Sequence, residues 1–533
     1  MSSSQLSVPV APRGVGTSSS RLSVAVAALV GVLSVAAGLG VGHLVGVLIS
    51  PTASPFLAVG GAAIDLTPTP LKEFAVRAFG SNDKTVLLLG MAVVIGLTGV
   101  LAGVLSRRSR VPGLGLLLVL GVIAAVAVQS RPGAGQGDIL APLAAMLASA
   151  GGFAVLHRLG LNASQSDEGQ PDQGQADAEV SRRRLLAGSA VVAAGAGLAA
   201  AGGQLLSGRG GVEASRAKVG RIVPTVAAPP IPAGADFVAD GSPSFITPNR
   251  DFYRVDVNLT VPQLRAEDWQ LRIHGMVDRE LALNWADLTS RRLIERPVTI
   301  TCVSNEIGGP YLSTANFTGV LLADILTEAG VRRGAEQIFT TSVDGWTCGS
   351  PTEVLIDPGR QAMLAIGMNG EPLPVEHGFP VRMIVPGLYG FVSATKWITD
   401  MELTTFDAQQ AYWLQRGWAK RAPIKTMSRI DRPGSFASVS PDSAITGIAW
   451  AQTRGIEKVE VRLDHGEWRT AQLATEVNKD TWRMWRLPGR WETGKHVAEV
   501  RATDQTGYTQ TADRAAPIPD GASGWHSVSF TVQ

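Results

Sequence analysis

The first two hundred residues contain long runs of apolar side chains that the rest of the chain lacks. Five such runs lie at 22–50, 85–106, 111–130, 139–156 and 185–207. Each reaches or nearly reaches the roughly 20 residues that a helix needs to cross a bilayer, and an open sheet there would leave backbone groups unpaired. The pattern predicts a five-helix transmembrane region over 1–207. The alternative for 139–156, which is short and rich in alanine, is a buried helix of a soluble domain.

Arginines mark one side of this region. They lie in the N-terminal tail, after the second run and before the fifth, at Arg13, Arg21, Arg107, Arg108, Arg110, Arg182, Arg183 and Arg184. Because basic loops stay in the cytoplasm, we expect a multi-pass cell-membrane protein with a cytoplasmic N-terminus and an extracytoplasmic C-terminal part. The stretch 181–186 also resembles a twin-arginine export signal, and plain anchoring would use the same arginines.

Polar and Pro/Gly-rich stretches separate these runs from the remainder. Residues 159–180 are typical of a disordered cytoplasmic loop, and 208–245 of a linker that holds the following part away from the bilayer. From 246 to 424 the pattern is mixed. Short β-branched runs predict strands at 298–301, 338–341 and 381–385, and an amphipathic run predicts a helix over 318–330, ended by Gly330.

After residue 425 the pattern alternates with a period of two. The runs 458–463, 497–501 and 528–532 are separated by Gly, Asp and Pro turns, which predicts a β-sandwich of about a hundred residues over 425–533. Its tryptophans are expected in the core and at interfaces rather than in a ligand site.

Composition narrows the choice of partners. A net charge of +2 offers no electrostatic case for nucleic acid. The chain has two cysteines, Cys302 and Cys348, and a disulfide between them is one expectation for an exported domain.

The surroundings of Cys302 indicate another role. A predicted strand runs into this cysteine and is followed by a polar turn that ends in Gly308-Gly309. The sulfur is therefore presented at a strand end, where a thiolate is suited to a thiophilic metal or to nucleophilic attack.

A second segment, 368–397, gathers basic side chains on loops around a strand. His377, Arg382 and Lys396 form a natural anion pocket, and guanidinium groups bind phosphate with two hydrogen bonds. The alternative, that these are surface charges, fits Arg382 poorly because it interrupts an apolar strand.

Together, the cysteine-bearing strand, MNGEPLPVEHGFPVR, VPGLYGFVSATKW and GWHSV resemble the sulfite oxidase family of molybdopterin enzymes over roughly 246–533. The resemblance implies an α+β molybdopterin domain over 246–424, followed by an immunoglobulin-like β-sandwich. It also implies a molybdenum–molybdopterin cofactor and, because the sandwich often mediates dimerisation in that family, a homodimer.

Carried over position by position, the resemblance makes Cys302 the thiolate ligand of molybdenum and the catalytic residue. It places the remaining cofactor-binding positions at Phe252, Tyr253, Arg254, Thr341, His377, Arg382, Ser393 and Lys396.

The chain departs from the sulfite-oxidising members at the substrate pocket. Those members carry a tyrosine where this chain has Ile366, and arginines where it has Glu306 and Ile307. A dianion such as sulfite needs cationic donors. We therefore expect a sulfite oxidase-like enzyme that performs oxo-transfer on a small extracytoplasmic substrate and is not specific for sulfite, with electrons exchanged with a separate redox protein or a membrane electron carrier.

Two rival functions remain to be compared. The first is a non-catalytic extracytoplasmic binding module on a membrane anchor, which predicts a Cys302–Cys348 disulfide. The second is a transporter, which the lack of charges within the apolar runs argues against.

Overall fold

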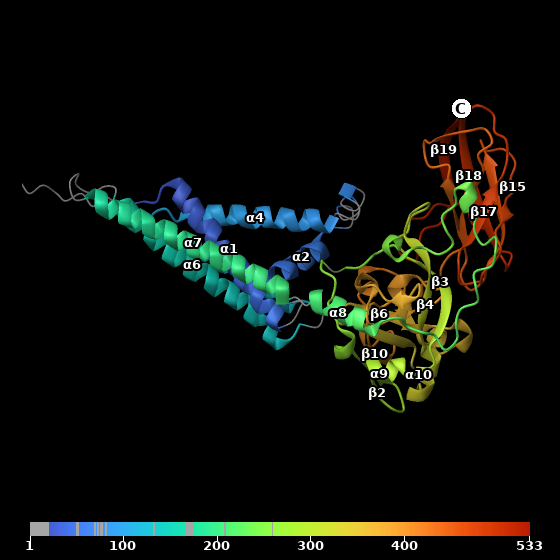
Figure 1. Ribbon diagram of the computed structural model, residues 1–533, viewed down its shortest axis with the longest axis horizontal. Coiled ribbons are helices and arrows are strands. Elements are labelled where there is room, and N and C mark those ends of the chain that lie inside the picture. Colours follow the sequence, from blue (N-terminus) through green and yellow to red (C-terminus); the bar gives the residue numbers. More distant parts are fainter. Residues whose placement is uncertain are drawn as a thin grey trace, which may run out of the picture. The chain divides into compact units, whose positions relative to one another are not determined.

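The computed structural model describes residues 21–533 except 50–52, 69–70, 72–73, 75–77, 80–82, 132–133, 167–173, 207–208 and 258. The chain divides into two compact units, Met1–Ser207 and Gly208–Gln533. The first is helical and the second is rich in strands (Figure 1).

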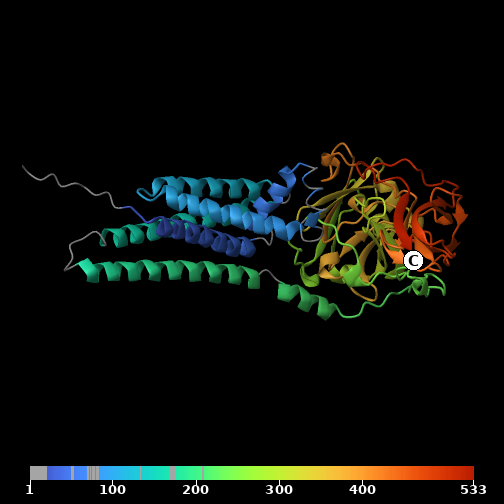
Figure 2. The ribbon, with the colours of Figure 1, turned by 90° about the horizontal axis from the view of Figure 1, so that it is seen from above.

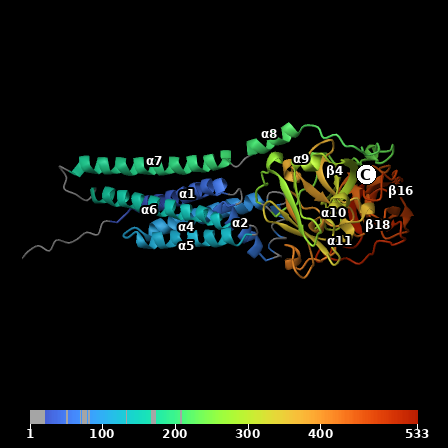
Figure 3. The ribbon, with the colours of Figure 1, turned by 90° about the horizontal axis from the view of Figure 1, so that it is seen from below.

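Among the residues that the structure describes, five helices of the first unit are long and apolar enough to cross a membrane, and each contains one of the predicted runs or most of it. They lie side by side (Figures 2 and 3), with a short apolar helix α2 (Pro55–Leu66) after the first. Their bounds are α1 Val24–Ile49, α4 Asp83–Leu105, α5 Val111–Gln129, α6 Leu140–Ser166 and α7 Gly174–Leu206.

Helices α6 and α7 are longer than expected. The stretch 159–180 was expected to be a loop, yet helix continues to Ser166 and begins again at Gly174. Once a helix has formed, each further residue adds one backbone hydrogen bond. An ion pair one turn apart, Arg183 with Glu179, adds to the start of α7.

Small residues let α1 and α4 approach until their backbones touch. A Cβ atom built on Gly31 of α1 would lie 1.8 Å from the carbonyl oxygen of Gly99, and one on Gly103 would lie 1.8 Å from that of Ala27. Membrane helices associate through such small-residue contacts because lipid provides no hydrophobic drive between them.

The second unit begins with helix α8 (Arg209–Val219). Its Val212 side chain is buried, and the Ser215 hydroxyl accepts a hydrogen bond from the amide of Ala266 at 3.0 Å. Further along, the indole of Trp482 donates to the carbonyl of Phe245 at 3.0 Å. Residues near both ends of the stretch expected to be a linker, 208–245, therefore contact the rest of the unit.

Two five-stranded sheets form the first part of this unit, with short helices beside them. Their strand orders are β2-β1-β10-β5-β6 and β3-β4-β7-β8, and β9 pairs with β7. The strands are β1 Gln270–Gly275, β2 Leu281–Asn284, β3 Ile294–Thr301, β4 Leu312–Leu321, β5 Gln337–Ser342, β6 Thr347–Pro351, β7 Met363–Met368, β8 Glu371–Pro372, β9 Arg382–Ile384 and β10 Ile398–Thr404, and the helices are α9 Trp285–Thr289, α10 Leu322–Ala329 and α11 Thr352–Leu355.

The helix predicted over 318–330 is only half a helix. Its first residues continue β4, and α10 begins at Leu322 and ends before Gly330, whose φ of +71° closes it. β4 lies between β3 and β7 in the sheet, and residues on both of its faces are buried. That pattern cannot be told from the apolar stripe of a helix by periodicity alone.

The C-terminal part is a β-sandwich. A four-stranded sheet, β11-β13-β17-β16, and a five-stranded sheet, β12-β19-β18-β14-β15, enclose one hydrophobic core that includes Trp485 and Phe530. The strands are β11 Met427–Arg432, β12 Ser438–Val439, β13 Ile445–Trp450, β14 Ile456–Leu463, β15 Arg469–Thr470, β16 Gln472–Leu473, β17 Arg483–Leu487, β18 Gly494–Asp504 and β19 His526–Val532.

Candidate active site

Cys302 follows the last residue of β3, as the sequence pattern predicts. Its amide donates to the carbonyl of Tyr311 at 2.9 Å, which closes the turn between β3 and β4. Its Sγ lies 2.9 Å from the hydroxyl oxygen of Ser304. Both Cys302 and Cys348 are free thiols, so the disulfide required by the binding-module alternative is not formed.

Three aromatic rings, one of them on Tyr311, lie next to one another. The ring of Tyr253 stacks on Phe252 with centroids 5.6 Å apart and lies 6.4 Å from that of Tyr311. Burial raises the pKa of Tyr253 well above its usual range, the Cys302 thiolate raises it further, and the Arg382 guanidinium lowers it. Tyr253 therefore lies within electrostatic reach of both the cysteine and the arginine of the predicted site.

Arg382 is a buried cation with unused hydrogen-bonding capacity. It begins β9 and is only 5% exposed. One Nη atom donates to the carbonyl of His377 at 3.2 Å, whereas Nε finds no partner among the residues that the structure describes. Burial lowers its pKa to about 10, which still leaves it charged at neutral pH. A buried guanidinium with an unpartnered N–H donor is suited to bind an anion, which would accept a hydrogen bond from it.

His377 lies beside Arg382 as a neutral ring. Its Nε2 is 3.3 Å from the carbonyl oxygen of Asn249, and Phe252 meets its ring edge-on at 5.3 Å. Burial, with the nearby charges of Arg382 and Lys396, lowers its pKa to about 3. Because a carbonyl oxygen only accepts, Nε2 donates to Asn249, and the neutral imidazole can offer Nδ1 as an acceptor, but no charge, to a ligand.

Lys396 and Arg254 share one carboxylate. The Lys396 ammonium lies 3.0 Å from Oδ2 of Asp256, and Nε of Arg254 donates to the same oxygen at 2.7 Å. Burial lowers the pKa of Lys396 to about 8, and Asp256 opposes that shift. Arg382 lies near enough to lower the pKa of Lys396 further, and the carboxyl group of Asp344, whose pKa burial raises, also interacts with Lys396. The pocket favours an anion.

The remaining predicted residues have other positions. The Ser393 hydroxyl donates to the carbonyls of Leu388 and Tyr389 at 3.1 and 2.9 Å, so it shapes its own loop. Thr341 lies in β5 opposite Asp400 of β10. Its neighbour Thr340, not singled out from the sequence, reaches the loop instead, with its hydroxyl 2.7 Å from that of Thr395.

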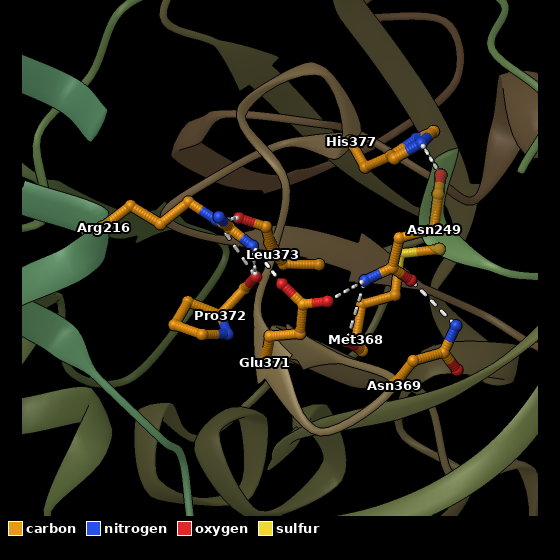
Figure 4. Close-up of polar contacts among 8 residues, drawn as sticks. All are labelled: Arg216, Asn249, Met368, Asn369, Glu371, Pro372, Leu373 and His377. Carbon is orange, nitrogen blue, oxygen red and sulfur yellow. Dashed lines mark hydrogen bonds and ion pairs between the residues drawn. The ribbon is translucent and has the colours of Figure 1, made fainter. Parts of the chain in front are cut away.

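A polar network that the sequence did not reveal holds the turn before His377 (Figure 4). The Asn369 side chain donates to Oδ1 of Asn249 at 2.8 Å, and Asn249 in turn donates to the carbonyl of Met368 at 3.3 Å. Arg216 of α8 donates to the carbonyls of Pro372 and Leu373, both at 2.9 Å. Asn369 has φ of +52°, a conformation that asparagine tolerates. An asparagine at this turn is the local sequence feature that could have indicated the network.

The two substitutions expected in the substrate pocket differ in their surroundings. Ile366 is fully buried in β7 among other apolar residues of the core. Glu306 is exposed in the turn after Cys302, and its carbonyl accepts from the amide of Gly309 at 2.9 Å. The turn therefore presents a carboxylate to solvent near the thiol.

Comparisons with known proteins agree with this geometry. Residues 258–413 match the family model of the oxidoreductase molybdopterin binding domain. The chain is 28% identical to human mitochondrial sulfite oxidase over 342 residues, 54% of this chain and 62% of that protein. It is 32% identical to the NADPH nitrate reductase of Emericella nidulans over 291 residues, 45% of this chain and 33% of that protein.

Among solved structures, the sulfane dehydrogenase SoxCD of Paracoccus pantotrophus matches 57% of this chain and 88% of its own, at 22% identity and a TM-score of 0.47. The chain spans 62% of the length of the mammalian sulfite oxidases it matches, and over that part the similarities support two predictions: the enzyme class, a molybdopterin-dependent oxidoreductase, and its molybdenum–molybdopterin cofactor. The residues present fit that group, because the free donor of buried Arg382 and the excess of cations suit a phosphate, while Cys302 supplies a soft ligand.

Proposed function

We propose that this molybdopterin-dependent oxidoreductase is anchored in the cell membrane by its N-terminal helices and performs oxo-transfer on a small extracytoplasmic molecule. One observation carries the assignment. The thiol of Cys302 follows the end of β3, and Nε of the buried Arg382 finds no partner in the part of the chain that the structure describes. The charges of both Cys302 and Arg382 shift the pKa of Tyr253, which indicates that the two residues belong to one site.

The chain's own residues have separate tasks in this proposal. Cys302 is the protein's ligand to the metal, and Arg382, Lys396 and His377 hold the phosphate and pterin, with Arg254 and Asp256 completing the charge balance. When bound, the molybdenum–pterin group supplies two-electron exchange of an oxygen atom. The adjoining rings of Phe252, Tyr253 and Tyr311 are assigned the task of excluding water near the thiol.

The substrate is proposed to lack the double negative charge of sulfite. The segment 303–309 contains no arginine, and Glu306 exposes a carboxylate there. A carboxylate near the metal repels a dianion, whereas a neutral substrate escapes this penalty. A separate redox protein or a membrane electron carrier completes the cycle. Turnover of sulfite that exceeds turnover of a neutral sulfoxide in a dye-coupled assay would contradict this substrate class.

Membrane anchoring and sidedness rest on the five apolar helices and the arginines between them. Fusions of alkaline phosphatase, which is active only outside the cytoplasm, test the orientation. A fusion after residue 220 should be active and one after residue 110 inactive. The reverse result would place the catalytic part in the cytoplasm.

The C-terminal β-sandwich is proposed to be immunoglobulin-like and to mediate a homodimer, with lipid around the first unit. Its two sheets around a shared core support the first part of this proposal. Size-exclusion chromatography with light scattering on the detergent-solubilised chain measures the oligomeric state.

Metal analysis of the purified full chain is the decisive experiment. Wild-type protein made in a host that assembles the cofactor should contain about one molybdenum per chain, and Cys302→Ala should lose most of it. Cys348→Ala is the matched control, because Cys348 is fully buried in β6 and its thiol is distant in sequence from the β3 end. Molybdenum absent from wild type, or undiminished in Cys302→Ala, would overturn the proposal.

A further inference from the structure

We propose that the β-sandwich positions the metal-binding thiolate, by holding the strand before Cys302 through Gln452 and the turn after it through Arg429. This inference rests on the proposed role of Cys302 as the ligand. It assigns to the second domain a task in the catalytic centre in addition to the proposed dimerisation, and it makes Gln452 and Arg429 positioning residues.

The sandwich covers the free edge of β3. One edge of this strand pairs with β4 from Ile294 to Thr301. On the other edge, the amide of Thr299 donates to the carbonyl of Asp480 at 3.0 Å, and the amide of Trp482 donates to the Thr299 hydroxyl at 2.7 Å. An edge strand with unpaired backbone groups needs such a cover.

Gln452 extends this cover to the end of the strand. Its side-chain amide is fully buried and donates to the carbonyl of Thr299 and to the hydroxyl of Thr301, both at 3.3 Å. Thr301 is the residue before Cys302. A buried amide held between two strand residues fixes their position more strongly than a solvent-exposed one would.

Arg429 of β11 holds the other side. One of its Nη atoms donates to the carbonyl of Gly309 at 2.8 Å, and its Nε donates to Asp431 at 2.7 Å. The two charged side chains are only 14% and 15% exposed. Asp431 of the sandwich therefore fixes the arginine side chain, whose guanidinium binds the backbone of the turn that begins at Cys302.

His526 of β19 fills the space beside this contact. Its Nδ1 accepts from the amide of Ile430 at 3.0 Å, so in the neutral ring the proton is on Nε2. A Cβ atom on Gly308 would lie 2.2 Å from that Nε2, and Gly308 has φ of +77°. The ring therefore lies directly on the backbone of Gly308, where only glycine fits.

These contacts bracket the cysteine. The hydrogen bond from the Cys302 amide to the carbonyl of Tyr311 closes the base of the turn. The sandwich contacts the chain at Thr299, three residues before Cys302, and at Gly308 and Gly309, six and seven residues after it. A ligand displaced by about 1 Å loses much of its efficiency in a preorganised site. Loss of the sandwich contacts should therefore loosen the thiolate without unfolding either domain.

Hydrogen–deuterium exchange on the full chain tests this directly, by mass spectrometry of peptides that cover 300–310. In Arg429→Met we expect the amides of Asn305 and Gly309 to exchange at least tenfold faster, while peptides of β14 and β18 keep wild-type rates. Arg501→Met is the matched control. Arg501 is also an ion-paired arginine of the sandwich, but it pairs with Glu460 on β14.

Gln452→Met gives an independent reading if Arg429→Met does not fold, and exchange at Thr301 and Cys302 should rise by a similar factor. Molybdenum content should fall below half of wild type on dialysis in both variants. Unchanged exchange over 300–310 in a folded variant would overturn the inference. Because exchange does not require molybdenum, a metal-free wild type would contradict the proposed function and leave this test intact.

Discussion

The ammonium group of Lys396 lies 3.0 Å from a carboxylate oxygen of Asp256, and neither side chain is more than 12% exposed. The pair belongs to the anion pocket, yet it is not neutral overall, because Arg254 donates to the same carboxylate. Two cations on one acid leave a positive excess for a phosphate to neutralise. The excess depends on the protonation of Lys396, which burial makes sensitive to pH.

Cofactor retention should therefore weaken above pH 8. Burial lowers the pKa of Lys396 to about 8, so its positive charge is present at pH 7 and is mostly lost at pH 9. Molybdenum retained after dialysis should fall severalfold between these pH values. Lys396→Arg, which stays charged, should flatten the profile. An equally steep profile in that variant would show that another group is responsible.

Removal of the buried guanidinium of Arg382 should reduce cofactor retention more than removal of an exposed guanidinium. Arg382→Met removes a buried Nε donor that finds no partner among the residues that the structure describes, and a charged hydrogen bond contributes about 1.5–3 kcal/mol. We expect cofactor retention to fall at least tenfold. Arg272→Met is the control, because Arg272 is 58% exposed and pairs with Glu280. Equal cofactor retention in both variants would show that Arg382 does not bind the cofactor.

Arg216 should contribute to stability at a distance from the chemistry. It joins α8 to the carbonyls of Pro372 and Leu373, in the turn that leads to His377 (Figure 4). Arg216→Met should lower the free energy of unfolding by about 1–2 kcal/mol, measured as a lower urea midpoint. Arg265→Met, which breaks an exposed pair with Asp268, should leave the urea midpoint almost unchanged.

Much of the architecture could be predicted because it depends on periodicity. Unbroken apolar runs predict the long helices, and a hydrophobic period of two predicts the strands of the sandwich. The three predicted strand segments all lie within β14, β18 and β19. β4 was partly misassigned because a strand buried on both faces shows no alternation. Helix α8 was missed because its fixing contacts, such as Ser215 with Ala266, lie about fifty residues away.

The site divides in the same way. His377, Arg382 and Lys396 lie within twenty residues of one another, and a motif can contain them. Arg429 and Gln452 reach the cysteine segment across 120 and 153 residues of sequence. No local pattern marks such a side chain, because its role depends on tertiary packing. Their identification required the structure.

Acid should destabilise the second unit through its buried histidines. Burial lowers the pKa of His526 to about 4 and that of His377 to about 3, from the usual 6.5. The unfolded chain therefore binds protons that the folded chain does not, and stability present above pH 6.5 is lost as the pH falls through 4. The urea midpoint should drop steadily over that range.

His526→Asn isolates one part of this effect. Asparagine can place an oxygen near the position of Nδ1 and accept from the amide of Ile430, but it does not titrate. We expect the variant to be less stable than wild type at pH 7.5, because packing on Gly308 is reduced, and to lose less stability on acidification to pH 4. The difference between the two curves measures His526 alone, since carboxylates contribute equally to both. Parallel curves would show that His526 takes up its proton without cost.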